Sequence, residues 1–197
     1  LAFLSAAFYQ FPAHKLRMIG VTGTDGKTTT TSLIYQILRA CEIRAGIIST
    51  IYAEIGDETI DTGFHVTTPE APFVQKYLHR MVTSGLTHAV LETTSFGLSQ
   101  HRVSGCEFDI GVLTNITHEH LDIHGSFEAY RGSKAMLFKQ VEYAPEKSIG
   151  NPRLNVLNRD DESYDYLSRI INSRQVAYSQ QPGLGDIWAE DIQIFEK

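Results

Sequence analysis

Apolar residues follow two patterns along this chain. Short continuous apolar runs, typical of buried parallel strands, predict strands at residues 16–22, 45–50, 87–92 and 108–113. The segments between and after these runs predict helices at residues 27–40, 68–84 and 126–140. Strands that alternate with helices indicate βαβ units, so we expect an α/β fold with a mostly parallel sheet and right-handed crossovers.

The other segments predict smaller elements around that sheet. Residues 1–9 have the pattern of an amphipathic helix, and residues 52–62 that of a hairpin that turns near Gly56. Thr68 is predicted to cap the second long helix, with Pro69 at its first position and Glu70 in its first turn. Later elements are expected as strands at residues 155–157, 175–178 and 187–194, a helix at 161–172 and a surface loop at 143–153.

Composition narrows the possible partners. The 197 residues suffice for one domain with a core, or for one domain and a fragment. A net charge of -6 argues against a broad surface for nucleic acid or anionic membrane, and no apolar run is long enough to predict membrane insertion. Cys41 and Cys106 form neither a metal spacing nor a disulfide framework, which favours a reducing, cytoplasmic location.

A glycine-rich run follows the first predicted strand and leads into the first long helix. Residues 20–30 are Gly-Val-Thr-Gly-Thr-Asp-Gly-Lys-Thr-Thr-Thr. Glycines let backbone N–H groups turn toward phosphate oxygens, and a helix N-terminus adds unpaired donors and partial positive charge. We therefore expect a phosphate-binding loop that holds a nucleotide and magnesium. Its predicted residues are Gly23, Thr24, Asp25, Gly26, Lys27, Thr28 and Thr29.

Within this loop, Lys27 is placed to reach the terminal phosphates and Thr28 to ligate magnesium. The run departs from the common phosphate-loop pattern, because Val21 stands where the first glycine would fall. The alternative is a glycine turn that only caps a helix. The Gly-Lys-Thr triplet at a strand-to-helix junction favours the phosphate loop.

An acidic residue, Glu92, ends the third predicted strand. Functional sites in open α/β sheets lie at the carboxyl ends of the strands, so Glu92 and the phosphate loop should meet there. An acid at such a strand end holds magnesium in phosphate-loop enzymes. The alternative is that Glu92 only caps the following turn.

Residues 115–124, Asn-Ile-Thr-His-Glu-His-Leu-Asp-Ile-His, follow the fourth strand. They place three imidazoles and two carboxylates between His118 and His124, and both group types bind divalent cations. The order differs from that of zinc-protease helices. A single histidine here would be structural, whereas this cluster predicts one or two metal ligands. Lys134, by its pattern alone, is an ordinary helix lysine.

Together these pieces resemble the central, ATP-binding domain of the Mur ligase family. The resemblance covers most of residues 16–161, and Gln100, His101, Arg102 and the Thr-Thr-Pro run at 67–69 are most similar to members that add the third amino acid of the peptidoglycan stem. It implies a phosphate-loop-containing, mostly parallel sheet flanked by helices, with a small accessory hairpin. The matching segments are residues 20–30, 67–69, 92–103, 115–124, 130–138 and 155–161.

The resemblance also implies a chemistry. ATP would phosphorylate the terminal carboxylate of UDP-N-acetylmuramoyl-dipeptide to an acyl phosphate, and the amine of a free amino acid would then displace phosphate. Lys27 would contact the β- and γ-phosphates, and Lys134 would be carbamylated to help hold a second magnesium ion. The implied magnesium ligands are Thr28, Glu92, His120 and carbamylated Lys134. The implied substrate contacts are Thr67, Thr68, Thr94, Gln100 and Arg102, and the nucleotide contacts outside the loop are Asn115, Asn158 and Asp161.

Three positions depart from the family pattern. Phe96 stands where the family usually has a histidine, which puts any polar role there in doubt. Glu119 stands where an aspartate is frequent and keeps the charge, and Asp25 replaces an asparagine while still able to stabilise the turn.

The resemblance implies further domains in the same protein. We expect residues 1–15 to be a linker or helix from a preceding uridine-binding domain, and residues 16–197 to be the central domain cut short at its C-terminal end, with the closing domain missing. On this view the fragment lacks full ligase turnover. We expect a monomer.

Two other functions stay open. The first is another ligase with this central domain, such as a folylpolyglutamate or cyanophycin synthetase, which residues 100–102 disfavour. The second is a non-catalytic nucleotide-binding module, for which Phe96 is the sequence hint. A switch GTPase is disfavoured because no guanine-reading motif is present in the sequence.

Overall fold

A twisted, mostly parallel sheet forms the centre of the molecule. The computed structural model describes residues 1–61, 68–118 and 124–193. Within them the sheet has nine strands in the order β4-β3-β2-β5-β1-β6-β7-β8-β9, and the strands from β2 to β9 in that order pair in parallel. The strands are β1 Arg17–Thr22, β2 Ala45–Ile48, β3 Tyr52–Ile55, β4 Glu58–Asp61, β5 His88–Glu92, β6 Ile110–Leu113, β7 Leu154–Asn158, β8 Arg174–Ser179 and β9 Ile187–Trp188.

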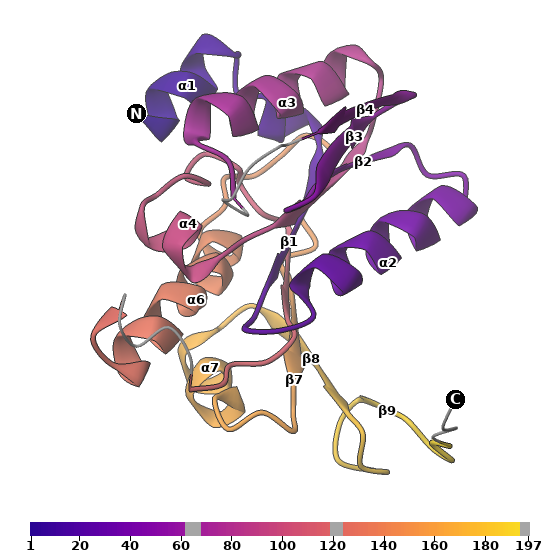
Figure 1. Cartoon of the computed structure of the whole chain (residues 1–197), viewed down its shortest axis with the longest axis vertical. Helices are drawn as coiled ribbons and strands as arrows, with labels where there is room; N and C mark the ends of the chain where they lie inside the picture. The colour runs from indigo at the N-terminus through magenta and orange to yellow at the C-terminus, as the bar shows by residue number, and fades with distance from the viewer. Residues whose placement is uncertain (62–67, 119–123, 194–197) are drawn as a thin grey trace.

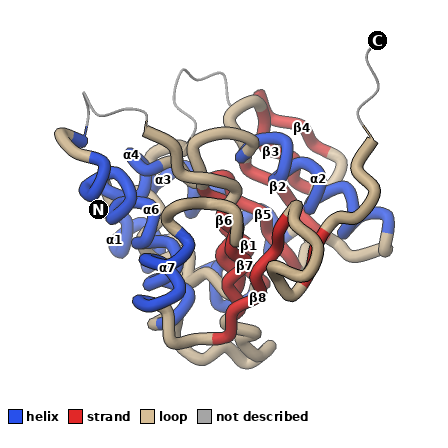
Figure 2. The backbone as a smooth tube through the Cα atoms, turned by 90° about the horizontal axis from the view of Figure 1, so that it is seen from below, coloured by secondary structure: helices blue, strands red, loops and turns tan. Residues whose placement is uncertain are grey.

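Helices cover both faces of this sheet (Figures 1 and 2). The helices are α1 Ala2–Phe8, η1 Pro12–Lys15, α2 Lys27–Ala40, α3 Ala71–Thr83, α4 Ser95–Ser99, α6 Phe127–Glu142 and α7 Tyr164–Ile170. The predicted α/β class, the parallel sheet and the accessory hairpin β3–β4 are all confirmed.

The central strand β1 shows how the two faces are built. Ile19 and Val21 point into the cluster under α2, whereas Met18 lies in the cluster on the opposite face. Gly20 faces that opposite side, where a Cβ atom would lie 2.6 Å from Leu137 Cδ1 of α6. Since so short a contact forces a shift, the glycine is what lets α6 pack close to β1.

Several predicted boundaries differ from the structure. The helix predicted from Thr68 begins at Ala71, so neither Thr68 as cap nor Pro69 as first residue is correct. The Thr68 hydroxyl instead accepts the backbone N–H of Thr94 at 3.0 Å and is thereby occupied. The helix predicted from residue 161 begins at Tyr164.

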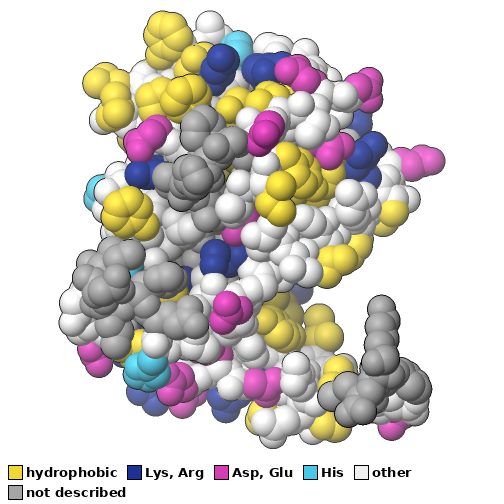
Figure 3. Space-filling model, viewed as in Figure 1, with side chains coloured by type: hydrophobic (Ala, Val, Ile, Leu, Met, Phe, Trp, Pro, Cys, Tyr) yellow, Lys and Arg dark blue, Asp and Glu magenta, His cyan; other side chains and the backbone are white. Residues whose placement is uncertain are grey.

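The N-terminal helix α1 packs on α3 through small residues. Ala2, Ser5 and Ala6 are buried, whereas the large apolar residues of α1 face outward, contrary to the usual amphipathic arrangement. Hydrophobic side chains gather at this end of the molecule in the space-filling view (Figure 3). The exposed ones at this helix are Leu1, Phe3, Leu4 and Phe8.

The surface loop at residues 143–153 is confirmed as irregular, but Lys147 within it is buried. In the part of the chain that the structure describes, we find no helix with the length and apolar character needed to cross a membrane.

Candidate active site

The glycine-rich loop joins the end of β1 to the start of α2, as the sequence predicts. Gly26 caps α2 with a left-handed φ of 75°, which glycine adopts without strain. Gly23 presses on the end of β6, where an added Cβ would lie 1.8 Å from Thr114 Oγ1. The loop therefore needs both glycines, one for its turn and one for its close packing.

Residues after β6 hold the loop in place. The Asp25 N–H donates to Asn115 Oδ1 at 2.9 Å, and the Asn115 side-chain amide donates back to the Asp25 carbonyl at 3.2 Å. Thr114 Oγ1 donates to the same carbonyl at 2.7 Å. The Asn115 side chain thus supports the loop by bonding to the backbone of Asp25.

The lysine of the loop, Lys27, begins α2 and donates to the Thr24 carbonyl at 2.6 Å. Thr24 itself is buried, and its hydroxyl accepts the Thr117 N–H at 2.9 Å and lies 3.1 Å from the Tyr130 hydroxyl. These contacts join the phosphate loop to the segment after β6 and to helix α6.

Glu92 and Thr28 meet at the carboxyl ends of β5 and β1, as predicted. Thr28 Oγ1 lies 2.9 and 3.0 Å from the two Glu92 carboxylate oxygens, and Glu92 is only 1% exposed. The Thr50 N–H and hydroxyl donate to Glu92 Oε2 at 3.0 and 2.9 Å. Glu92 therefore does not merely cap a turn; its carboxylate is held between two threonines.

Lys134 is not an ordinary surface lysine, because it is 1% exposed. Its ammonium donates to the Gly23 carbonyl and lies 4.4 Å from the centre of the Tyr130 ring. Helix α6 thus places Lys134 directly under the phosphate loop.

The described histidines of the 115–124 segment have separate partners. His118 stacks on Phe127 at 4.1 Å and pairs with Glu162 at 3.1 Å. His124 lies 3.1 Å from Ser95 Oγ and 3.4 Å from Ser133 Oγ. Within residues 1–61, 68–118 and 124–193, no three metal-ligating side chains of His, Cys, Asp or Glu form a group. Glu119, His120, Asp122 and Thr67 lie outside the described residues.

The predicted substrate residues form one cluster beside Glu92. Thr68 Oγ1 lies 3.1 Å from Thr94 Oγ1 and 3.4 Å from the Glu92 carbonyl. Arg102 donates to the Thr68 carbonyl and to Gln100 Oε1, both at 2.9 Å. The predicted residues 68, 94, 100 and 102 are thus brought together.

Asn158 and Asp161 support the segment after β6. The Asn158 amide donates to the Thr114 carbonyl at 2.8 Å, and Asp161 Oδ2 accepts the Ile116 N–H at 2.6 Å. Tyr178 of β8 adds to this support by donating to the Leu113 and Thr114 carbonyls, each at 3.0 Å. Burial, the largest cause, raises the pKa of Tyr178 to about 12.

Sequence reasoning missed three residues of this region, namely Thr50, Tyr130 and Tyr178. Thr50 ends the second strand predicted from the sequence, at residues 45–50, so its place at the same sheet edge as Glu92 was an available signal. Tyr130 and Tyr178 carry no comparable signal, because their contacts depend on how α6 and β8 pack.

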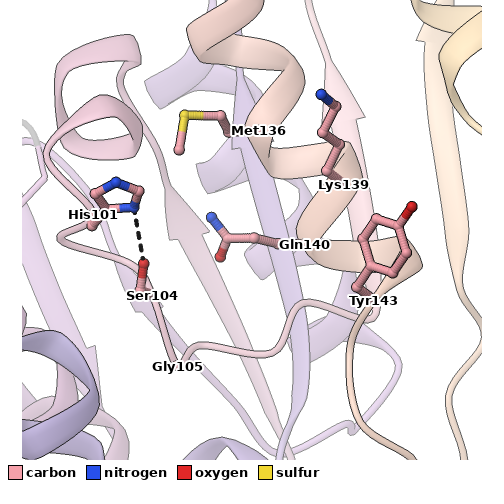
Figure 4. Close-up of a pocket in the computed structure, with 7 residues that line it drawn as sticks. All are labelled: His101, Ser104, Gly105, Met136, Lys139, Gln140 and Tyr143. Carbon is pink, nitrogen blue, oxygen red and sulfur yellow. Dashed lines mark hydrogen bonds between the residues drawn. The ribbon is translucent and has the colours of Figure 1, made fainter.

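A separate cavity of about 340 Å³ lies between α6 and the turn after α4 (Figure 4). Its polar side chains include His101 and Ser104, which face each other at 3.5 Å, and Lys139. None of the residues with a predicted role in ATP, metal or substrate binding lines this cavity.

Comparison with known proteins finds a matching family model and several similar proteins. The family description "Mur ligase middle domain" matches residues 21–197. The chain is 39% identical, over 194 residues, to the UDP-N-acetylmuramoyl-L-alanyl-D-glutamate--2,6-diaminopimelate ligase of Geobacillus kaustophilus, covering 98% of this chain and 39% of that protein. It is 49% identical over 138 residues to the ligase of the same name from Chlamydia felis, covering 70% of this chain and 28% of that protein.

Solved structures agree with these matches. A structure of a UDP-N-acetylmuramoyl-L-alanyl-D-glutamate--2,6-diaminopimelate ligase superposes with a TM-score of 0.74 and 31% identity, covering 88% of this chain and 34% of that one. The MurF ligase of Thermotoga maritima, solved in complex with ADP, gives a TM-score of 0.66 at 18% identity over 99% of this chain and 40% of that one, which supports the fold alone. The chain spans about two fifths of the length of its first relatives.

Proposed function

The chain belongs to the Mur ligase family, and on that premise we propose that it is the ATP-binding part of a ligase that extends UDP-N-acetylmuramoyl-dipeptide by one amino acid. The relatives in the comparison are named as ligases for 2,6-diaminopimelate, so we propose this as the amino acid added. The reaction would proceed through an acyl phosphate on the dipeptide, with ADP and phosphate as products.

The observation that carries the proposal is the meeting of Thr28 with Glu92 beside the phosphate loop. The Thr28 hydroxyl and the Glu92 carboxylate lie 2.9 Å apart, and both present oxygen atoms, which are the ligands that magnesium prefers. We propose Thr28, Glu92 and His120 as magnesium ligands. Magnesium bound there offsets the negative charge that a nucleotide and a carboxylate bring together.

The chain's own residues would then position the reactants. We propose that the backbone of residues 23–28 holds the phosphates and that Lys27 leaves the Thr24 carbonyl to reach the β- and γ-phosphates. The buried position of Lys134 under the loop suits a modified lysine, and we propose that its carbamate holds a second magnesium ion. Asn115, Asn158 and Asp161 would hold the loop in position on the side where the nucleotide binds.

We propose that Thr67, Thr68, Thr94, Gln100 and Arg102 contact the muramoyl-dipeptide. The cluster of Thr68, Thr94 and Arg102 beside Glu92 supports this assignment, because it lies next to the proposed metal site. We further propose that the chain acts within a longer protein, since it spans only 39% of the length of its first relatives. We also propose that this protein is a cytoplasmic monomer.

The test uses the full-length protein with magnesium, ATP and UDP-N-acetylmuramoyl-alanyl-glutamate. A panel of amino acids that includes lysine and 2,6-diaminopimelate is supplied, and phosphate release is followed together with the mass of the nucleotide product. A mass gain with 2,6-diaminopimelate is the expected result. A gain only with a folate acceptor would favour the folylpolyglutamate alternative, and ATP binding without any product would favour a non-catalytic module.

A further inference from the structure

Each of the three guanidinium nitrogens of Arg102 has a polar partner in this structure. Its Nε donates to Gln100 Oε1, one terminal nitrogen donates to the Thr68 carbonyl, and the other pairs with the Glu70 carboxylate, each at 2.9 Å. The ring of Phe96 lies 5.3 Å from the guanidinium carbon. Three of its five N–H donors are thus engaged, and an anion that approaches from the side of the exposed partner would compete with that partner.

The three partners differ in how easily they can be replaced. The Thr68 carbonyl belongs to a fully buried residue, and Gln100 lies two residues from Arg102 on the same turn. The Glu70 side chain is 57% exposed, whereas that of Arg102 is 9% exposed. A half-exposed ion pair contributes little net free energy, so Glu70 is the partner that an incoming anion displaces at the smallest cost.

The pair also lies close to the proposed site of reaction. Thr68, whose carbonyl accepts from Arg102, contacts both the Glu92 carbonyl and Thr94 through its hydroxyl. Glu70 precedes the first residue of α3, so its carboxylate lies at the edge of the same cluster. A group of the substrate that reaches Glu92 would therefore pass near Arg102.

The substrate of the proposed reaction carries a matching group. The relatives are named for a muramoyl-peptide that ends in glutamate, which has two carboxylates. One of them becomes the new amide, and the other stays charged and requires a cationic partner. A glutamate side chain already occupies Arg102 in this chain, with the same carboxylate chemistry.

We propose that Glu70 competes with the unreacted carboxylate of the substrate's glutamate for Arg102, and so sets the affinity for the muramoyl-dipeptide. This inference rests on the function proposed above. Glu70 is a specificity-determining residue in this view: it holds Arg102 in place and is exchanged when a ligand with a correctly placed carboxylate arrives, while a ligand without one does not displace it.

The alternative is that the Glu70–Arg102 ion pair has only a structural role (a strut) and links the start of α3 to the turn after α4. The two views predict opposite changes for Glu70→Gln, which keeps the shape and removes the charge. Competition predicts a KM for the muramoyl-dipeptide that is about two- to fivefold lower, the range of a half-exposed ion pair, with kcat and the KM for ATP unchanged. A strut predicts a lower Tm and a higher KM.

The experiment measures kcat, both KM values and Tm for the full-length protein and its variants. Glu58→Gln is the matched control, because Glu58 pairs with Arg80 near the other end of α3 and is 56% exposed, and it should leave the KM unchanged. Arg102→Lys should raise the KM for the dipeptide. An unchanged or higher KM in Glu70→Gln, with Tm retained, would overturn the proposal.

The two proposals fail in different ways. Absence of product in the unaltered protein, with every amino acid tried, counts against the ligase function itself. Product in the unaltered protein with no decrease in KM for Glu70→Gln counts against competition at Arg102 alone. Direct binding of UDP-N-acetylmuramoyl-alanyl-glutamate, measured by calorimetry for both proteins, separates affinity from turnover: tighter binding by Glu70→Gln supports the proposal, and equal or weaker binding overturns it.

Discussion

A carboxylate is buried at each end of the parallel strands, and the two carboxylates have different hydrogen-bond partners. At the amino end, Asp109 pairs with Lys147 at 2.6 Å, and both side chains are fully buried. Lys147 also donates to the Leu16 and Glu107 carbonyls at 3.0 and 2.7 Å. At the carboxyl end, Glu92 receives hydrogen bonds from the neutral Thr28 and Thr50.

This difference separates stability from function. Burial lowers the pKa of Lys147, and the nearby Asp109 opposes that effect, so the ammonium and carboxylate depend on each other. Hydroxyl partners around Glu92 supply no positive charge, and they leave the carboxylate able to accept a cation. We infer that the ion pair at the amino end holds strands β1 and β6 together. At the carboxyl end, Glu92 can exchange its hydroxyl partners for a cation.

The largest expected effect is at the amino end. Lys147→Met leaves Asp109 as a buried carboxylate without its cation, and should lower the free energy of unfolding by about 3–5 kcal/mol. Denaturant unfolding measures the change. Lys139→Met, at an exposed position of α6, should change it by no more than about 0.5 kcal/mol. Equal stability of the two variants would contradict a stabilising role for the pair.

A change at Glu92 should lower turnover and leave stability almost unchanged, the reverse of what is expected for Lys147. Glu92→Gln keeps the side-chain shape but removes the charge, and it should lower the proposed ligase turnover of the full-length protein by on the order of 10²–10³-fold. Its Tm should stay close to that of the unaltered protein, because its known hydrogen-bond partners are neutral. A loss of Tm that accounts for the loss of turnover would erase the distinction between the two ends.

A smaller effect should follow from Thr50→Val, which is nearly isosteric. Without the Thr50 hydroxyl, Glu92 Oε2 loses a hydrogen bond that orients the carboxylate, so the magnesium concentration for half-maximal turnover should rise about 10- to 100-fold. Titration of magnesium at saturating ATP measures this. Thr59→Val on the exposed strand β4 is the control and should leave the titration unchanged.

The smallest effect concerns Tyr178, which supports the carboxyl end through the carbonyls of residues 113 and 114. Loss of its hydroxyl in Tyr178→Phe should lower the free energy of unfolding by about 1 kcal/mol at neutral pH. Its pKa is raised from 10.0 to about 12 on folding, so the contribution is complete below pH 10 and is lost as pH rises toward 12. Unfolding of both proteins across this range should show a difference that shrinks above pH 10; a constant difference would refute the assignment.

Local sequence signals located much of the carboxyl end. Residues 27–40 were predicted as a helix and form α2 with those bounds, because a Gly-Lys-Thr start and a long run of compatible residues decide it locally. Glu92 was found because strand ends converge on one edge of a parallel sheet. Helix α4, only five residues long, was missed since it is too short for a periodic pattern.

The buried ion pair at the amino end could not be inferred from local sequence signals. Lys147 lies in an irregular loop, and its burial depends on Asp109, 38 positions earlier in the chain. The start of α3 was misplaced for a related reason: Thr68 looks like a helix cap locally, but its hydroxyl is used by Thr94 across the fold. Long-range partners override local preference at both positions.

The accessory hairpin has a consequence for handling the protein. Among the described residues, strand β4 is the last strand on its side of the sheet, and an edge strand with free backbone groups can pair with another copy of the chain. Glu58 and Asp61 lie exposed on this strand, and their like charges would face each other in the antiparallel register that sets Glu58 of one copy opposite Asp61 of the other. Replacing both with valine should therefore increase aggregation as the protein is concentrated, with no change to the residues at the carboxyl ends of the parallel strands.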